Sequence, residues 1–449
     1  MNSQIIRHRF PDGWKIKELN EFADDSADSF VDGPFGSDLK VSDYTPEGVR
    51  VLQLQNLGDG IFKNNSKIYT SETKAMQLRR CVTKPGDIII AKMAEPLARA
   101  AIVPSIDRKS LIVADLIKLR TAKDVDSNFL VNYINFYDFR READRLSTGT
   151  TRTRISLSTL KKISLPYPPI EQQKKIAEIL TSVDNLIEQT QNLIDKYTAV
   201  KQGMMADLFS RGIDLSGTQE NNKSYGQLRP SYEYAPELYH ETELGWVPRD
   251  WDVVKIDNIS TQMTNGFVGV ATPHYANENE AGIRYLYGNN VRADKLELDT
   301  VLKIKPEFHQ KLQKSQLRQG DMLTVQSGHI GTTAIVPPNF GEANCHALII
   351  TRLVQSKILP EFLSFYLNSA IGMNRMEEIF VGSTIKHVNV KELKSFLVPL
   401  PSIEEQQAAL NKIVGARNLI DDELKYLEKL KLKKKGLMQD LLTGKVKVD

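Results

Sequence analysis

The sequence predicts an α+β chain in which two tandem, pseudo-symmetric modules of mixed α/β structure are separated by two long antiparallel helices that form a coiled coil. Three observations predict this: motifs that recur once at a nearly constant offset, β-branched runs bounded by Gly, Pro or Asp, and a long amphipathic run at the end of each half. The recurring motifs are Pro11-Asp12-Gly13-Trp14 with Pro248-Arg249-Asp250-Trp251, Gly86-Asp87 with Gly320-Asp321, Ala101-Ile102-Val103-Pro104 with Ala334-Ile335-Val336-Pro337, and Leu165-Pro166-Tyr167-Pro168 with Val398-Pro399-Leu400-Pro401. A repeat of this length indicates a duplicated module, because solenoid units run to only about 20–50 residues.

The strands expected in the first module are residues 51–54, 87–91 and 111–113, and their expected counterparts are 284–287, 321–325 and 347–350. A helix is expected after them in both modules, over Asn128 to Leu146 and over Pro360 to Phe380. The second of these helices has a proline in its first turn, where the missing N–H costs nothing. Each module is therefore predicted to be a small α+β unit of roughly 150 residues.

Each half ends in a long helix with a heptad pattern. Prolines at 166, 168 and 169 end the preceding strand, and residues 171–209 contain no proline. The first seam consists of Ile176, Leu180, Val183, Ile187, Thr190, Ile194, Tyr197, Met204 and Leu208. The second helix, Ile403 to Leu442, has Leu410, Ile413, Ile420, Leu424, Leu427, Met438 and Leu441 at matching spacing, with Arg417, Lys431 and Lys434 interrupting the seam. Two helices of this length pack most economically on each other, although each could instead lie on its own module.

The expected limits of the two modules and the two long helices divide the chain into five segments. They are the first module (1–164), the first long helix (165–211), a connector (212–243), the second module (244–397) and the second long helix (398–449). The connector is rich in Asn, Gln, Ser and Pro, which predicts irregular structure. Its tyrosines Tyr232, Tyr234 and Tyr239 predict that it docks on a neighbouring surface.

Composition is that of an ordinary globular chain: 449 residues, 41% apolar, 26% charged and a net charge of +3. This charge permits a nucleic-acid partner without requiring one. The two cysteines, Cys81 and Cys345, are expected to be buried free thiols in a reducing compartment. The polar N-terminus and the lack of an apolar run of about 18 residues predict a cytoplasmic protein without a membrane span.

Catalytic motifs are not recognisable in the sequence. Gly444-Lys445 lacks the rest of a phosphate-binding loop, and residues 337–340 have the letters of a methyltransferase loop in the wrong order. The fragments at 72–74 and 392–394 have no convincing upstream Pro-Asp of a nuclease. None of the seven histidines is spaced like a zinc ligand. The chain is therefore predicted to be non-catalytic and to hold no metal.

Two polar, glycine-containing loops recur in each module: residues 92–99 and 149–154 in the first, and 326–333 and 382–387 in the second. Hydroxyls, free N–H groups and cations suit phosphate oxygens, and Arg, Lys, Gln, His and Asn can read base edges. Such loops are often ordinary solvated turns, but their recurrence with different contents favours a tunable recognition surface. The candidate DNA-binding residues are Lys40, Lys92, Arg99, Thr150, Thr151, Arg152, Arg154, Gln326, Ser327, His329, Thr332, Ser383, Thr384, Lys386 and His387.

Further distinctive segments follow one another along the chain. They are Gly33-Pro34-Phe35-Gly36-Ser37-Asp38-Leu39-Lys40, the segment from Leu165 to Gln173, the segments 235–239 and 244–251, and the helix endings 203–209 and 436–442. With these segments and the four loops, essentially the whole chain resembles the specificity subunit of type I restriction-modification systems. One departure is Asn265-Gly266-Phe267-Val268-Gly269, which stands where the first module has Gly33-Pro34-Phe35-Gly36.

The resemblance implies two target-recognition domains, each of which binds one half of an asymmetric bipartite site in double-stranded DNA, held apart by the long helices. It also implies two methyltransferase subunits that use S-adenosylmethionine, and two restriction subunits that use ATP and Mg²⁺. The chain itself would bind no cofactor and would scaffold these subunits. Two alternatives stay open. One is a specificity subunit that serves a fused methyltransferase-nuclease of type IIB or IIG kind, and the other is a coiled-coil adaptor that binds proteins.

Overall fold

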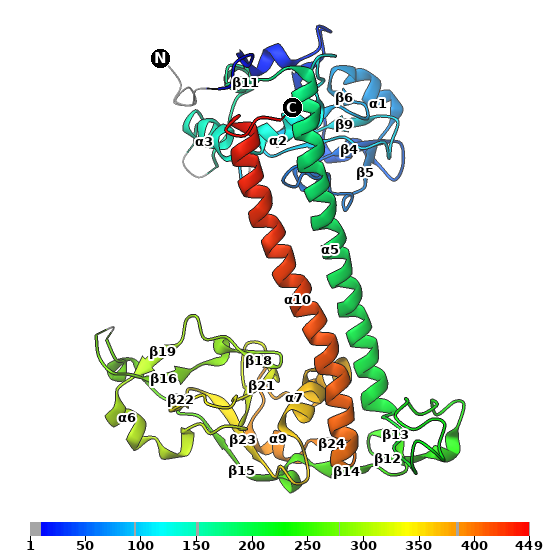
Figure 1. The fold of residues 1–449 in the computed structure, drawn as a ribbon, viewed down its shortest axis with the longest axis vertical. Coiled ribbons are helices and arrows are strands. Elements are labelled where there is room, and N and C mark those ends of the chain that lie inside the picture. Colours follow the sequence, from blue (N-terminus) through cyan, green and yellow to red (C-terminus); the bar gives the residue numbers. More distant parts are fainter. Residues whose placement is uncertain (1–9, 94–95, 150–151, 278, 383–385, 449) are drawn as a thin grey trace. The chain divides into compact units, whose positions relative to one another are not determined.

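The computed structural model describes residues 10–93, 96–149, 152–277, 279–382 and 386–448. These residues form two compact units (Figure 1). Unit 1 combines Met1–Gln191 with Lys425–Asp449, and unit 2 is Asn192–Leu424. Each unit thus contains one module and one segment of each long helix. The division into five segments stays a prediction.

Two sheets form the centre of unit 1, with strand orders β2-β10-β7-β8 and β3-β5-β4-β9-β6. The strands are β2 (Phe30–Asp32), β3 (Tyr44–Thr45), β4 (Val49–Leu52), β5 (Ile68–Thr70), β6 (Val82–Thr83), β7 (Ile88–Ala91), β8 (Ala100–Ile102), β9 (Ser110–Ile112) and β10 (Leu116–Leu119). A separate pair joins β1 (Lys15–Glu18) to β11 (Ser164–Tyr167). The short helices are α1 (Glu72–Gln77), α2 (Ser127–Ile134), α3 (Tyr137–Arg145) and α4 (Leu157–Leu160). Strands β4, β7 and β10 are buried at every position, so they form the core of the module.

Unit 2 repeats the four-stranded sheet as β15-β23-β20-β21 and the pair as β14-β24, whereas its second sheet, β19-β16-β22, is smaller and a further pair joins β17 to β18. The strands are β14 (Asp252–Lys255), β15 (Ser260–Asn265), β16 (Ile283–Leu286), β17 (Val291–Arg292), β18 (Lys295–Leu296), β19 (Leu302–Ile304), β20 (Met322–Val325), β21 (Thr333–Ile335), β22 (Ala343–Cys345), β23 (Leu348–Leu353) and β24 (Leu397–Leu400). Its short helices are α6 (Pro306–Lys311), α7 (Pro360–Asn368), α8 (Ala370–Glu378) and α9 (Val390–Ser395). Both units contain one parallel pair, β4 with β9 and β16 with β22. The predicted duplication is confirmed.

Two details of the prediction were wrong. The helix expected over 128–146 is split into α2 and α3 by the extended residue Phe136, and Ser369 splits the second helix into α7 and α8. Ser369 starts α8 as an N-cap, because its side chain accepts from the backbone N–H of Gly372. The strand at 111–113 was also matched with the wrong partner. Strand β9 corresponds to β22, whereas β23 corresponds to β10, which was not predicted.

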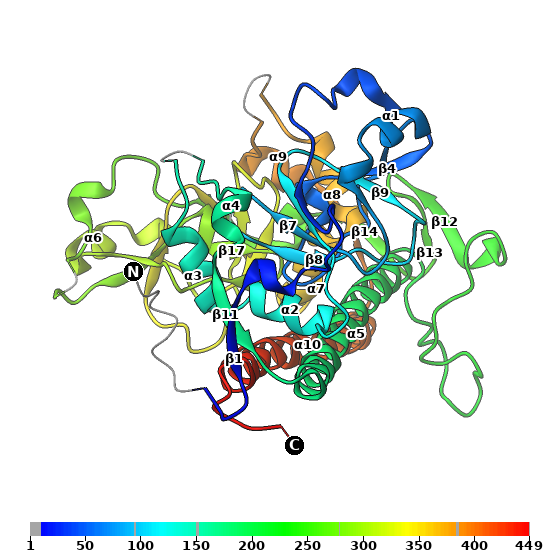
Figure 2. The same cartoon turned by 90° about the horizontal axis from the view of Figure 1, so that it is seen from above.

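The long helices are α5 (Ile170–Ser210) and α10 (Ile403–Leu442), close to the predicted limits. In unit 1, Ile176 and Leu180 share a buried cluster with Leu441 and Leu442, and Asp184 forms a 2.6 Å ion pair with Lys434. The two segments therefore run antiparallel in unit 1, where the end of α10 lies beside β1 (Figure 2). In unit 2, the last turns of α5 share a cluster with the first turns of α10, through residues such as Phe209 and Ile413. The helix pairing is confirmed within each unit, except that the predicted seam residue Leu424 is 43% exposed.

The connector docks on unit 2, as predicted, but it is not wholly irregular. It ends in the hairpin of β12 (Tyr239–Thr242) and β13 (Gly245–Pro248). Tyr239 is buried, and Tyr232 stacks on Trp246 with ring centroids 4.3 Å apart. Tyr234 contributes nothing to this docking, because it is 88% exposed.

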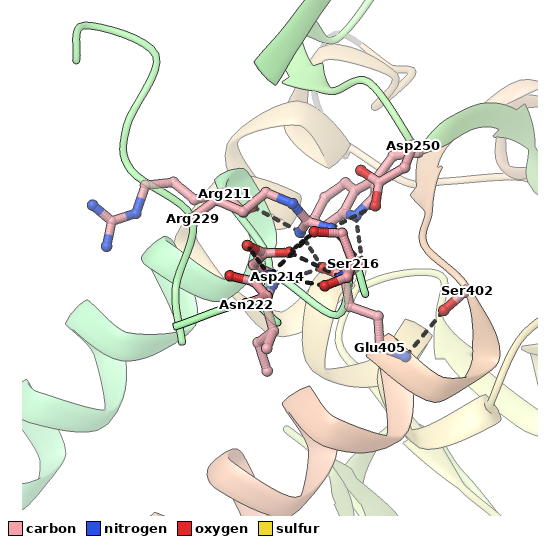
Figure 3. Close-up of polar contacts among 10 residues, drawn as sticks. Arg211, Asp214, Ser216, Asn222, Arg229, Asp250, Ser402 and Glu405 are labelled. Carbon is pink, nitrogen blue, oxygen red and sulfur yellow. Dashed lines mark hydrogen bonds and ion pairs between the residues drawn. The ribbon is translucent and has the colours of Figure 1, made fainter. Parts of the chain in front are cut away.

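A buried ion pair fixes the connector to the start of α10 (Figure 3). Arg229 Nη1 lies 2.5 Å from Glu405 Oε1, and its Nη2 lies 2.6 Å from Asp250. Glu405 also accepts hydrogen bonds from Trp251 Nε1 and from the backbone N–H of Ile213. The chain turns at Gly212, whose φ of +65° and near contact with Glu405 exclude a side chain. In unit 1, Trp14 Nε1 donates to Gln172 at the equivalent place, so an amide replaces the carboxylate.

Both cysteines are buried free thiols, as predicted. Burial raises the pKa of Cys81 and of Cys345, which keeps both as neutral thiols near pH 7. The structure thus gives them the role of small apolar core residues.

We expect Arg229→Met to destabilise unit 2 by about 3 kcal/mol, because it leaves the Glu405 carboxylate buried without its cation. The unfolding midpoint should fall by roughly 6–12 °C in a thermal melt followed by tryptophan fluorescence. The double variant Arg229→Met/Glu405→Gln should recover part of this loss, since no unpaired charge then stays buried. A double variant less stable than the single variant would contradict this role for the ion pair.

Candidate nucleic-acid interface

In each unit, polar side chains from several segments lie where the strands of one sheet end. In unit 1 the segments are the end of β2, the turn between β9 and β10, the start of the loop after β7, and the described residues 148–149 and 152–154 that follow α3. We call this surface the polar face. It consists of Asp32, Lys92, Met93, Asp115, Arg152 and Arg154 in unit 1, and of Asn265, Gln326, Ser327, Lys386 and His387 in unit 2.

Backbone hydrogen bonds hold the two loops of each polar face together. In unit 1, Ile155 N–H donates to the Lys92 carbonyl at 3.0 Å, and in unit 2, Val388 N–H donates to the Gln326 carbonyl at 3.1 Å. Reciprocal bonds close the second loop, between Thr148 and Arg154 and between Val381 and His387. The two loops that the sequence singled out in each module are therefore neighbours.

Two glycines make this arrangement possible. A side chain at Gly33 would meet the carbonyl oxygen of Val113, and one at Gly266 would meet that of Cys345. The segment 265–269 departs from the first module in sequence but keeps this close backbone approach. The residue directly before each of these glycines, Asp32 in unit 1 and Asn265 in unit 2, lies on the polar face.

The polar face of unit 1 contains two ion pairs. Lys92 Nζ lies 2.9 Å from Asp32 Oδ1, and Arg154 Nη2 lies 3.1 Å from Asp115 Oδ1. Arg154 is 57% exposed, so its pair contributes at most about 1 kcal/mol and the guanidinium can be redirected to a phosphate. Arg152 is exposed next to it. The three cations exceed the two carboxylates, which suits an anionic ligand.

The central contact on the polar face of unit 2 is between neutral amides. Gln326 Nε2 donates to Asn265 Oδ1 at 3.2 Å and to the Val388 carbonyl at 3.3 Å. Lys386 is exposed and supplies a positive charge, and Ser327 is exposed beside Gln326. The two units thus present different chemistry on the same backbone arrangement.

Four of the predicted DNA-binding residues are not part of the polar face. Arg99 donates to the Leu57 carbonyl at 3.2 Å, and His329 Nε2 lies 2.9 Å from the Val291 carbonyl. Thr332 is half-buried and its carbonyl accepts from Val325, and Lys40 lies in the segment before β3. Thr150, Thr151, Ser383 and Thr384 lie outside the described residues.

Sequence reasoning missed Asp32, Asp115 and Asn265. Asp32 and Asn265 could have been found, because each precedes the first glycine of the matched segments. It also missed an aromatic cluster of unit 2, in which the Tyr287 ring stacks on His346 at 4.8 Å and Phe267 lies beside it. Burial lowers the pKa of His346, which favours a neutral ring near pH 7.

Within the described ranges, no group of three or more His, Cys, Asp or Glu side chains is placed to hold a metal ion. In the same part of the chain, no helix is long and apolar enough to cross a bilayer.

The chain belongs to the family of type I restriction modification DNA specificity domains, which matches residues 52–197 and 248–414. A similar protein is the type I restriction enzyme MjaVIII specificity subunit of Methanocaldococcus jannaschii, 23% identical over 98% of this chain and 94% of that protein. The EcoBI specificity subunit of Escherichia coli is 24% identical over 60% of this chain and 54% of that protein.

Two solved structures share the fold. One comes from work on the complex assembly and conformational transition of a type I R-M system, with a TM-score of 0.56, 16% identity, and coverage of 98% of this chain and 100% of that chain. The other is the S subunit of such a system from M. genitalium, with a TM-score of 0.54, 15% identity and coverage of 97% of each chain. The family and the fold agree with the resemblance found in the sequence.

We expect Arg152→Ala and Lys386→Ala each to weaken binding to duplex DNA, because each removes an exposed cation from a polar face. If the cation contacts a phosphate, the slope of log K against log salt should become shallower by about one unit. Fluorescence anisotropy at several salt concentrations measures both quantities. Lys223→Ala, which removes an exposed lysine of the connector, is the matched control. Unchanged affinity in both variants would remove these loops from the interface.

Proposed function

We propose that this chain is the DNA sequence-specificity subunit of a type I restriction-modification complex, and that each polar face reads one half of an asymmetric bipartite site in double-stranded DNA. One observation carries the proposal: the two modules share sheet topology and loop scaffold but present different polar side chains at matching positions. Binding proteins fix their register through phosphate contacts and read sequence through base edges. Different side chains on one scaffold therefore suit two different half-sites.

The chain itself is proposed to be non-catalytic. S-adenosylmethionine, ATP and Mg²⁺ would be used by partner subunits, two methyltransferases and two restriction subunits. A specificity subunit for a fused methyltransferase-nuclease stays the nearest alternative, and the identity of the co-purified partner distinguishes the two.

A pair of equivalent grooves supports binding of two copies of one partner. The grooves lie beside the first turns of α5 and of α10, and measure about 370 Å³ in unit 1 and about 530 Å³ in unit 2. The two linings match position by position: Asp126, Asn128, Lys174, Ala177, Glu178, Thr181, Ser182 and Asn185, against Leu359, Glu361, Gln407, Leu410, Asn411, Val414, Gly415 and Asn418. A protein surface that fits one groove therefore finds a second groove at the equivalent place of the other unit, although most of the lining side chains differ. We assign these grooves to the two methyltransferase subunits.

The proposed function is tested by a gel shift with the chain, its methyltransferase subunits and duplex DNA of random sequence. The complex should shift the duplex, whereas a coiled-coil adaptor should give no shift. In the same assay, the chain alone with S-adenosylmethionine should transfer no methyl group to DNA. The absence of any shift, or robust methylation by the isolated chain, would contradict the proposal.

The groove assignment predicts that Ser182→Arg and Gly415→Arg each reduce the number of bound methyltransferase subunits from two to one. Both positions are exposed, and a side chain at Gly415 meets no other atom within 4 Å, so the helices tolerate the change. Native mass spectrometry counts the subunits, with Ser182→Ala and Gly415→Ala as controls. The double arginine variant should bind none. Two subunits bound to the double variant would contradict the assignment.

A further inference from the structure

One contact of the polar face occurs in both units with different chemistry. Lys92 follows β7 and meets Asp32 at the end of β2, and Gln326 follows β20 and meets Asn265 at the end of β15. Because β7 corresponds to β20 and β2 to β15 in the two sheets, the pairs occupy the same place in the fold. An ion pair in unit 1 is thus replaced by an amide pair in unit 2.

Two contacts that support the fold are the same in both units. Arg120 binds Asp87 through two hydrogen bonds of 2.8 Å, and Arg352 binds Asp321 through two of 2.8 and 3.1 Å. The side chains of Asn135 and Asn368 each bridge the N–H and carbonyl of one residue of the neighbouring strand, Ala100 and Thr333. The side chains are therefore kept at these two supports, whereas they differ at the pair on the polar face.

In neither pair does the contact between the two side chains use all of their hydrogen-bonding groups. Asp32 Oδ1 is buried, and among the described residues nothing donates a hydrogen bond to it, because Lys92, whose side chain is 15% exposed, approaches it without hydrogen-bond alignment. Gln326 Nε2 donates to Asn265 Oδ1 and to the Val388 carbonyl, which uses both of its N–H donors, whereas Asn265 Nδ2 donates to nothing in the part of the chain that the structure describes. Asp32 is 42% exposed, and Asn265 is also exposed. The exposed side chains of Asp32 and Asn265 can therefore face a ligand on the polar face, with Lys92 and Gln326 behind them.

We propose that these two pairs are specificity-determining, with Lys92–Asp32 favouring a G·C base pair and Gln326–Asn265 favouring an A·T base pair in their respective half-sites. An ammonium donates to the O6 and N7 acceptors of guanine, and a carboxylate accepts from the N4 amino group of cytosine. A side-chain amide donates and accepts at once, which matches the N6 and N7 atoms of adenine. The assignment rests on the proposed function, since it names the bases that the polar faces read.

The test exchanges the two chemistries. Lys92→Gln/Asp32→Asn gives unit 1 the amide pair, and Gln326→Lys/Asn265→Asp gives unit 2 the ion pair. These side chains are close in size to those they replace, so both variants should fold with wild-type unfolding midpoints. Each variant, assembled with its methyltransferase subunits, selects sequences from two duplex libraries in which one half-site or the other is randomised.

We expect each exchange to change the preferred base pair at one position of one half-site by about tenfold or more, and to leave the other half-site unchanged. The control is Lys109→Gln/Glu72→Gln, which removes an exposed ion pair of unit 1 outside the polar face and should keep both half-sites. Equal weakening on every sequence would show contacts to phosphate and contradict the assignment, as would unchanged selection. A wild-type complex that selects no sequence would instead contradict the proposed function itself.

Discussion

The central constraint is the backbone hydrogen bond that ties the two loops of each module together where both leave the sheet. It joins Ile155 to Lys92 in unit 1 and Val388 to Gln326 in unit 2. Since a backbone bond does not depend on side-chain identity, the residues around it can change without moving the loops. The same surface can therefore hold an ion pair in one module and an amide pair in the other. A fold with this property can alter what it recognises while its core stays fixed.

Two surfaces, the polar face and the groove, occur at equivalent places in both units. The polar faces carry different side chains at matching positions, whereas the grooves beside α5 and α10 are lined by the same set of positions in both units. The proposed function has two requirements. The polar faces must bind two different half-sites, and the grooves must bind two copies of one partner. The duplicated module meets both requirements, because it repeats the backbone positions of both surfaces and lets the side chains at these positions differ.

The sequence predicted what depends on short-range patterns. The limits of α10 follow from a proline before it and the heptad spacing within it, and the strand β7 follows from its β-branched run after Gly86. The breaks at Phe136 and Ser369 were missed because the apolar pattern continues across them, so only the local backbone conformation reveals them. The pairing of Asp32 with Lys92 was missed because it joins residues 60 positions apart. The internal contacts of Arg99 and His329 could not be predicted, because a long side chain in a polar loop can turn to a carbonyl of its own module.

The most direct test of two different readers in one chain is long-read detection of methylated adenines in a host that carries the intact system. The account predicts a single motif made of two unlike short sequences, separated by a constant stretch in which any base is accepted. A continuous motif, or one whose two parts are the same sequence, would contradict it.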